Sequence, residues 1–253
     1  MKKTKKAASF FVGMFLLIVA WQAVVTIGKY EEALLPGPLS VMQAFIGMTL
    51  DGSLFLHLKD SLFRFGAGYL AAAVPAVLAG ILLGRSNRIW AIIDPVVQVL
   101  RPISPVAWSP FIVLWFGIGN MPAIAVIFIA AFFPILLATV NGVRNVDEHY
   151  LKIAANLQFN KLAVLKKIIF PAALPAIISG LHIAIGTAWI FLVAGEMIGA
   201  QSGLGYLIVD ARNTLDLDIV LAGIATIGIC GFLLDRFIAF GEFLLKKYSG
   251  FLL

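Results

Sequence analysis

Six long apolar stretches, separated by shorter polar segments, dominate the sequence. Most of them approach the roughly 20 residues that a helix needs to cross the hydrocarbon layer of a membrane. None shows the apolar/polar alternation of membrane β-strands. The pattern predicts an all-α integral membrane protein, a single transmembrane domain over residues 1–253, with spans at about 8–27, 66–84, 102–117, 123–143, 172–199 and 219–240.

Proline and glycine interrupt this pattern between the spans. The turn residues Pro36-Gly37-Pro38 come before an amphipathic stretch at about 54–65, which predicts a helix at the membrane interface ahead of the second span. Four prolines between 95 and 110 cannot sit in one regular helix, so a short helix ending near Arg101 is expected before the third span. Residues 200–218 are rich in Gly and Asp and predict a polar loop.

The second span carries Gly80 and Gly84 at the spacing that lets membrane helices approach closely. The motif by itself is weak, because glycine is frequent in membrane helices. It predicts a helix contact on this face of the second span.

Composition supports a membrane protein. Hydrophobic residues make up 61% of the chain and charged residues 13%, which excludes an ordinary soluble enzyme and a disordered chain. A nucleic-acid-binding module is excluded as well, although the isoelectric point is near 9.5. The one cysteine, Cys230, lies in an apolar run, and the three histidines lack ligand spacing, so neither a disulfide nor a metal site is expected.

The basic residues predict the orientation. With six spans and both termini in the cytoplasm, fifteen of the 19 Lys and Arg fall on the inner side, which is the positive-inside bias of membrane proteins. The first span follows four lysines and could be a signal peptide, but no cleavage site follows it closely, so a retained span is favoured. The outer side keeps Lys29, Lys59, Arg64 and Arg212.

No catalytic constellation and no phosphate-binding loop is visible, so the chain is not expected to be an enzyme or to bind a cofactor or metal. Polar or amphipathic groups within spans are costly unless they face a cavity. Glu196 is a polar contact at an outer gate, a partner for a positive group there, or a helix-end residue that reaches interfacial water. Helix packing and back-bonding to helix carbonyls explain the other candidates equally well. The candidate pathway residues are Ser104, Trp108, Thr187, Trp189 and Glu196.

The most informative segment is the polar insert at 144–171, between the fourth and fifth spans. It predicts two short helices joined by a turn at 158–161, forming a compact knob outside the bilayer. Leu151, Ala154, Ala155 and Leu157 give the first helix an apolar face. About 28 residues of patterned helix exceed what a simple connection needs.

This insert resembles the cytoplasmic E-A-A-x3-G-x9-I-x-L-P coupling motif of the permease subunits of type I ABC importers. Counted back from Pro171, the glycine of the motif falls on Gln158 and its Glu on Lys152. Three of seven signature positions match. The segments 35–38, 100–110, 114–119, 132–136, 142–147 and 195–206 are similar to the nitrate/sulfonate/taurine/bicarbonate branch, and the resemblance covers about residues 35–245.

The resemblance implies a multi-pass permease of the bacterial inner membrane that forms the pathway for a small solute. Its partners would be two ATPase subunits that use ATP and Mg, a second permease copy and an external binding protein. The solute would be a small anion such as a sulfonate, taurine, nitrate or bicarbonate; the alternative is a thiamine precursor or a similar metabolite. The implied ATPase-coupling residues are Asp147, Glu148, Lys152, Ile153, Ala154, Ala155, Gln158 and Pro171.

Two other classes remain as alternatives. A stand-alone channel or secondary transporter would use discontinuous spans, and the proline-rich segment 95–110 can be interpreted in that way. A membrane scaffold or membrane-embedded enzyme lacks support, because the spans contain no catalytic pair.

Overall fold

All the regular structure in the described part of the chain is helical. The computed structural model describes the backbone of residues 2–32 and 34–248 and the side chains of residues 12–32 and 34–241. The elements are α1 (Lys2–Gly28), α2 (Pro38–Leu50), α3 (Ser53–Gly84), α4 (Asn87–Leu100), the 3-10 turn η1 (Pro105–Trp108), α5 (Ser109–Phe116), α6 (Asn120–Arg144), α7 (Glu148–Asn156), α8 (Lys161–Val164), the π-helical η2 (Leu165–Ile169), α9 (Phe170–Gly199), α10 (Leu204–Thr214) and α11 (Leu217–Tyr248).

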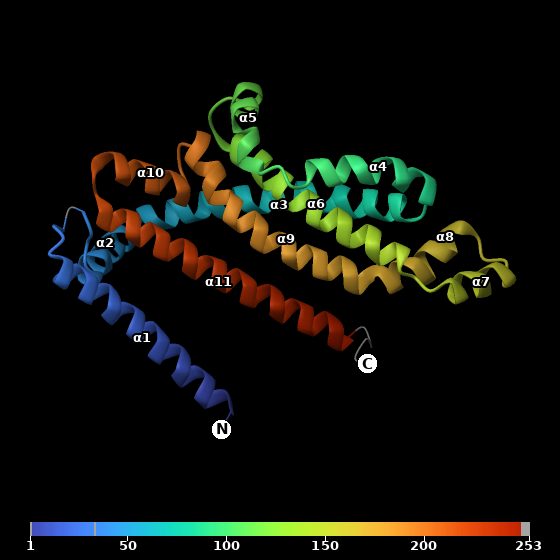
Figure 1. Cartoon of the computed structure of the whole chain (residues 1–253), viewed down its shortest axis with the longest axis horizontal. Helices are drawn as coiled ribbons and strands as arrows, with labels where there is room; N and C mark the ends of the chain where they lie inside the picture. The colour runs from blue at the N-terminus through green and yellow to red at the C-terminus, as the bar shows by residue number, and fades with distance from the viewer. Residues whose placement is uncertain (1, 33, 249–253) are drawn as a thin grey trace.

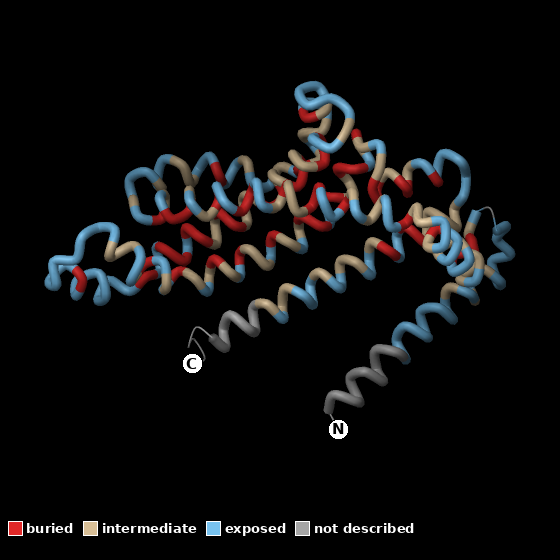
Figure 2. The backbone as a smooth tube through the Cα atoms, turned by 180° about the vertical axis from the view of Figure 1, so that it is seen from behind, coloured by how far each residue is buried: buried red, intermediate tan, exposed pale blue. Residues whose placement is uncertain are grey.

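The centre of the molecule is formed by α3, α6 and α9, three long helices that lie side by side (Figure 1). Their buried residues face one another and form the main core (Figure 2). Small residues allow the close approach, as the spacing of Gly80 and Gly84 predicts. A Cβ atom at Gly80 would lie 2.6 Å from Thr139 Cβ, and one at Gly84 would lie 2.8 Å from Val143 Cβ.

Two helices flank this core. The helix α11 runs alongside α9, and the indole N–H of Trp189 donates to the carbonyl of Ile227 at 3.1 Å. The helix α1 diverges from the body, and most of its described side chains are exposed (Figures 1 and 2). At one end of the body lie α2 and α10, and at the opposite end α7 and α8 (Figure 1). These are called the α10 end and the α7 end below.

Four helical segments in the described residues are long and apolar enough to cross a membrane: 53–84, 120–144, 161–199 and 217–241. The expected helices at 123–143, 172–199 and 219–240 lie within three of them. The amphipathic helix expected at 54–65 and the span expected at 66–84 are parts of one helix, because α3 is continuous from Ser53 to Gly84.

The expectation of one regular helix at 102–117 is also wrong. The segment forms η1 and the eight-residue α5, and this pair is bent by 86° from α4. Prolines 102, 105 and 110 lack backbone N–H groups and prevent a continuous helix. Together α4, η1 and α5 are apolar enough for a fifth, broken span or a re-entrant loop. The short α5 projects from the body (Figure 1).

The predicted polar loop at 200–218 is largely helical, as α10. Its buried residues Leu204, Leu207, Ile208 and Ala211 are three or four positions apart and form one apolar face. The glycine and aspartate residues in and around α10 are typical of a loop and conceal this periodicity. The helix α2, at 38–50, was not predicted either.

Candidate functional site

The insert between α6 and α9 forms two helices with a turn between them, as predicted. The carboxylate of Asp147 accepts the backbone N–H of His149 at 2.8 Å and so caps the start of α7. The turn ends α7 with Gln158 in the left-handed region, at φ 55°. The second helix is continuous with α9 through α8 and η2, so the knob is attached directly to a long apolar helix.

One side of α7 is apolar and exposed, although the helix lies outside the long apolar helices. Tyr150, Ile153 and Leu157 are 59%, 54% and 61% exposed. Their spacing of three and four residues places them on one side of the helix and its end. Of the predicted apolar face, Ala154 is buried, whereas Leu151, Ala155 and Leu157 are exposed in the lone chain. Exposed apolar clusters of this kind mark interaction sites.

The predicted coupling residues come together, with one exception. Asp147, Glu148, Lys152, Ile153, Ala154, Ala155 and Gln158 all lie on α7 or at its ends. The ammonium group of Lys152 lies 3.4 Å from the Glu148 carboxylate, and both side chains are exposed. Such a pair contributes little to stability. Pro171 lies apart from this cluster, in the first turn of α9.

A cleft of about 540 Å³ brings two of the predicted pathway residues together. Its walls come from the segment 101–105, α6 and α9, and it is lined by both Ser104 and Thr187. Arg101 lines the same cleft, which otherwise consists mostly of apolar groups. The Thr187 hydroxyl also donates to the carbonyl of Ile183 at 3.0 Å, the back-bond expected of a hydroxyl in a helix. Trp108 lies beyond this cleft, next to Phe111.

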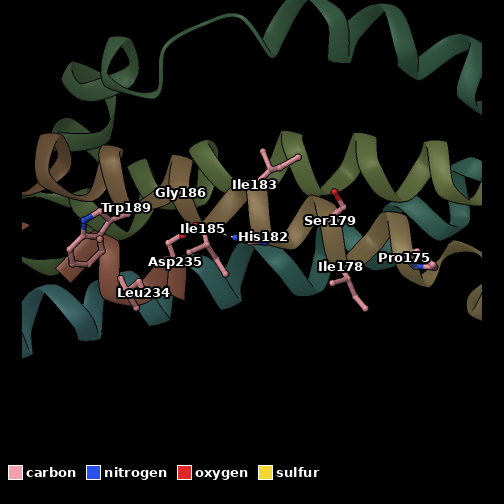
Figure 3. Close-up of a pocket in the computed structure, with 11 residues that line it drawn as sticks. Pro175, Ile178, Ser179, His182, Ile183, Ile185, Gly186, Trp189, Leu234 and Asp235 are labelled. Atoms are coloured by element: carbon pink, nitrogen blue, oxygen red, sulfur yellow. Dashed lines mark hydrogen bonds and ion pairs between the residues drawn. The ribbon is translucent and has the colours of Figure 1, made fainter. Parts of the chain in front are cut away.

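A second groove, of about 500 Å³, runs between α9 and α11 (Figure 3). His182 and Asp235 face each other across it, with Nε2 3.3 Å from Oδ1. Both belong to helices long enough to cross the membrane, where ionisable groups mark functional sites by default. Trp189 lines the end of this groove and packs edge-to-face on Phe65. The sequence does not predict a role for His182, because its partner Asp235 is 53 residues away.

Glu196 belongs to a third place, a buried polar cluster at the α10 end. Its carboxylate lies 2.7 Å from Nη1 of Arg64, and each residue is at most 2% exposed. Glu196 also accepts hydrogen bonds from the Ser61 hydroxyl and from the backbone N–H of Gly205, both at 2.8 Å. Arg64 further donates to Ser202, on the loop that leads into α10.

This cluster holds the ends of three helices and a loop together. Its two opposite charges are paired, and each buried polar side-chain atom in it has a hydrogen-bond partner. Such a network holds the helices that carry it in one relative position. A positive partner for Glu196 is among the alternatives from the sequence, but the sequence does not identify Arg64 as that partner, because Arg64 is grouped with the basic residues of the outer side. The predicted pathway residues therefore lie in separate places: Ser104 and Thr187 in one cleft, Trp189 in the α9–α11 groove and Glu196 in the buried cluster.

The sequence matches the family model for the binding-protein-dependent transport system inner membrane component over residues 76–245. It is 36% identical to the putative aliphatic sulfonates transport permease protein SsuC of Bacillus subtilis, with 98% of this chain and 91% of that protein covered. It is 36% identical to the taurine permease protein TauC of Escherichia coli, covering 87% and 82%. The nitrate import permease protein NrtB of Synechocystis is also 36% identical, covering 91% and 86%.

The fold is similar to that of solved ABC transporters. An inward-facing structure of the MetNI methionine ABC transporter superposes with a TM-score of 0.58 at 18% sequence identity, covering 75% of this chain and 98% of that chain. At that identity the likeness establishes the fold alone. The family match and the curated relatives show that the chain belongs to the binding-protein-dependent transport system inner membrane components, as a multi-pass permease subunit of an ABC importer whose ATPase is a separate subunit.

Proposed function

We propose that two copies of this chain form the pathway of an ATP-driven importer for a small oxyanion. Two ATPase subunits hydrolyse ATP with Mg, and an external binding protein delivers the solute. The exposed apolar surface of α7, formed by Tyr150, Ile153 and Leu157, is the observation that carries this proposal. A surface of this kind needs a protein partner, and the family supplies one in its ATPase.

The α7 end therefore lies in the cytoplasm and the α10 end outside. In this orientation the chain crosses the membrane six times, with α1 as the first span, the broken α4–α5 unit as the third and both termini inside. The basic residues support it, because Lys161, Lys166 and Lys167 cluster beside α7. Since α8, η2 and α9 are continuous, a movement of the docked knob acts directly on the fifth span.

The cleft between segment 101–105, α6 and α9 is the proposed solute pathway. It combines one guanidinium group, from Arg101, with the hydroxyl groups of Ser104 and Thr187. A planar cation beside the Ser104 hydroxyl suits a sulfonate, nitrate or bicarbonate, because guanidinium pairs with oxyanions through two hydrogen bonds. The Thr187 hydroxyl already donates to the carbonyl of Ile183. The relatives named for sulfonates, taurine and nitrate support the same chemical class.

ATPase measurements test the proposal. The purified permease alone hydrolyses no ATP. The complex with its cognate ATPase should hydrolyse ATP, and the cognate binding protein loaded with a sulfonate or nitrate should stimulate this activity. Solute uptake driven by an ion gradient through the permease alone would instead establish a secondary transporter. A binding protein that binds only a neutral or cationic metabolite would overturn the assignment of an oxyanion.

A further inference from the structure

Leu215, in the turn between α10 and α11, has an unusual conformation. Its φ is 65° and its ψ is 23°, and its side chain is 74% exposed. The left-handed conformation costs a non-glycine residue about 1–2 kcal/mol, and glycine or asparagine is the usual choice at such a helix end. An exposed leucine at this position adds nothing to the folding of the lone chain. A strained, exposed apolar residue points to a function in binding.

Carboxylates surround this leucine. A cleft of about 190 Å³ beside Leu215 is lined by Glu32, Asp216 and Asp218, and no basic residue contributes to it. Negative charge also prevails in the two segments that form this end, 28–60 and 203–218. They contain seven carboxylates against three basic side chains, although the whole chain has a net charge of +6. Arg64 adds no charge to this balance, because it is buried against Glu196.

The helix that carries the turn is firmly positioned. The backbone N–H groups of Gly203, Leu204 and Gly205 donate to His57, Ser61 and Glu196, at 3.1, 2.8 and 2.8 Å. These bonds fix the start of α10 against α3 and α9. The surface at its far end is therefore formed before any partner arrives, which lowers the entropic cost of binding.

We propose that Leu215, with the carboxylates of Glu32, Asp216 and Asp218, forms the docking site for the external solute-binding protein. The partner's surface is a shallow apolar depression edged by Lys and Arg side chains. The inference rests on the proposed function, which places the α10 end outside and supplies the binding protein. The acidic surface also repels a free oxyanion, so the solute enters only when a protein with a basic edge delivers it.

Other occupants fit this surface less well. Anionic lipid headgroups are repelled by the same carboxylates. A divalent cation would need several carboxylates converging on one point, and no such group exists in the part of the chain that the structure describes. The carboxylates instead accept hydrogen bonds from their neighbours: Glu32 from Ser40, Asp216 from Thr214 at 2.6 Å, and Asp218 from the N–H of Ile219 at 2.9 Å.

Two variants test the site in the intact permease–ATPase complex in lipid nanodiscs. L215G removes the apolar side chain and lets the turn keep its positive φ without strain. D216N/D218N removes two charges, while the amide oxygens can still accept the hydrogen bonds from Thr214 and Ile219. The affinity for the cognate solute-binding protein is measured by surface plasmon resonance from low to high salt. Co-elution of the ATPase verifies that each variant complex is assembled.

The matched controls are L50A and D51N, which lie outside the cleft beside Leu215. Leu50 is 82% exposed at the end of α2. Hydrogen bonds from the Ser53 side chain and backbone N–H lower the pKa of Asp51, so this control also removes a charge at neutral pH. It retains an amide oxygen that can accept from Ser53, as D218N does for Ile219.

Each test variant is expected to weaken binding by roughly tenfold, which corresponds to about 1.4 kcal/mol, and the controls by less than about twofold. D216N/D218N should also flatten the salt dependence, whereas L215G should leave its slope unchanged. Affinities within twofold of the original for both test variants would overturn the docking site while leaving the importer intact. If the unaltered complex does not bind the protein at all, the proposed function itself fails.

Discussion

The guanidinium of Arg64 and the carboxylate of Glu196 lie 2.7 Å apart, both almost completely buried between α3 and α9 at the α10 end. The hydrogen bonds around this pair extend to Ser61, Asn120 and the loop leading into α10. The pair joins the helices of the proposed pathway to the surface proposed to receive the binding protein. The pair therefore has a structural role, and removing either charge alone would leave the other buried without a partner.

Removing one member of this pair should destabilise the permease strongly. E196Q leaves the buried Arg64 uncompensated, and R64M leaves the Glu196 carboxylate uncompensated; either costs about 3–5 kcal/mol. The double variant R64M/E196Q leaves no buried charge and should lose clearly less than the sum of the two. Thermal unfolding of the three purified variants in detergent measures this coupling. Additive losses would show that the two side chains act independently.

Docking of the ATPase should depend on the exposed side of α7. Ile153 is 54% exposed, so I153D should leave the permease folded and abolish co-purification of the ATPase. A154E should also abolish it, but by disrupting the knob, because the Ala154 side chain is buried. Comparing the thermal stability of the two variants separates these effects. An ATPase that still co-purifies with I153D would exclude this side of α7 as the contact.

Gln158 occupies the position of the glycine in the coupling motif and has the backbone conformation that glycine favours, with φ 55°. Q158G should therefore relieve strain and stabilise the turn by about 0.5–1 kcal/mol, whereas Q158V should destabilise it. Hydrogen exchange of the amide of Phe159, which donates to the carbonyl of Ala154 at 3.0 Å, reports on the turn. Faster exchange in Q158G than in the unaltered protein would contradict this interpretation.

Arg101 is expected to determine the charge preference of the pathway. R101A should reduce uptake of a sulfonate or nitrate by at least about tenfold, because the cleft loses its cation. R101K should recover part of the uptake, since it restores the charge without the planar pair of donors. The control is R88A, a basic residue that does not line this cleft. If R101A and R88A reduce uptake equally, Arg101 has no special role in the pathway.

The sequence predicts the long helices well, because apolar runs of membrane length leave few alternatives. It predicts α7 and its turn for a similar reason: the polar insert interrupts those runs and begins with a capping aspartate, Asp147. It fails for α10, because the glycine and aspartate residues in and around this short helix are typical of a polar loop. It also fails for the segment from Pro102 to Phe116, because prolines show that a helix breaks but not the angle at which it continues.

The candidate sites also differ in how far the sequence predicts them. The coupling residues are local in sequence, so a pattern of a few residues was enough to group them. The buried cluster joins Arg64 to Glu196 across 132 residues, and the groove joins His182 to Asp235 across 53. Such pairs arise from the packing of separate helices, and a single sequence does not record which side chains meet.

The measurement that tests the account most directly is uptake of a labelled sulfonate or nitrate by liposomes containing the permease, its ATPase and its binding protein. We predict accumulation that requires ATP on the side of the membrane where the ATPase lies and the binding protein on the opposite side. The I153D variant should lose this accumulation. Uptake that continues without ATP, or without the ATPase subunit, would contradict the claim that this chain is the passive pathway of an ATP-driven importer.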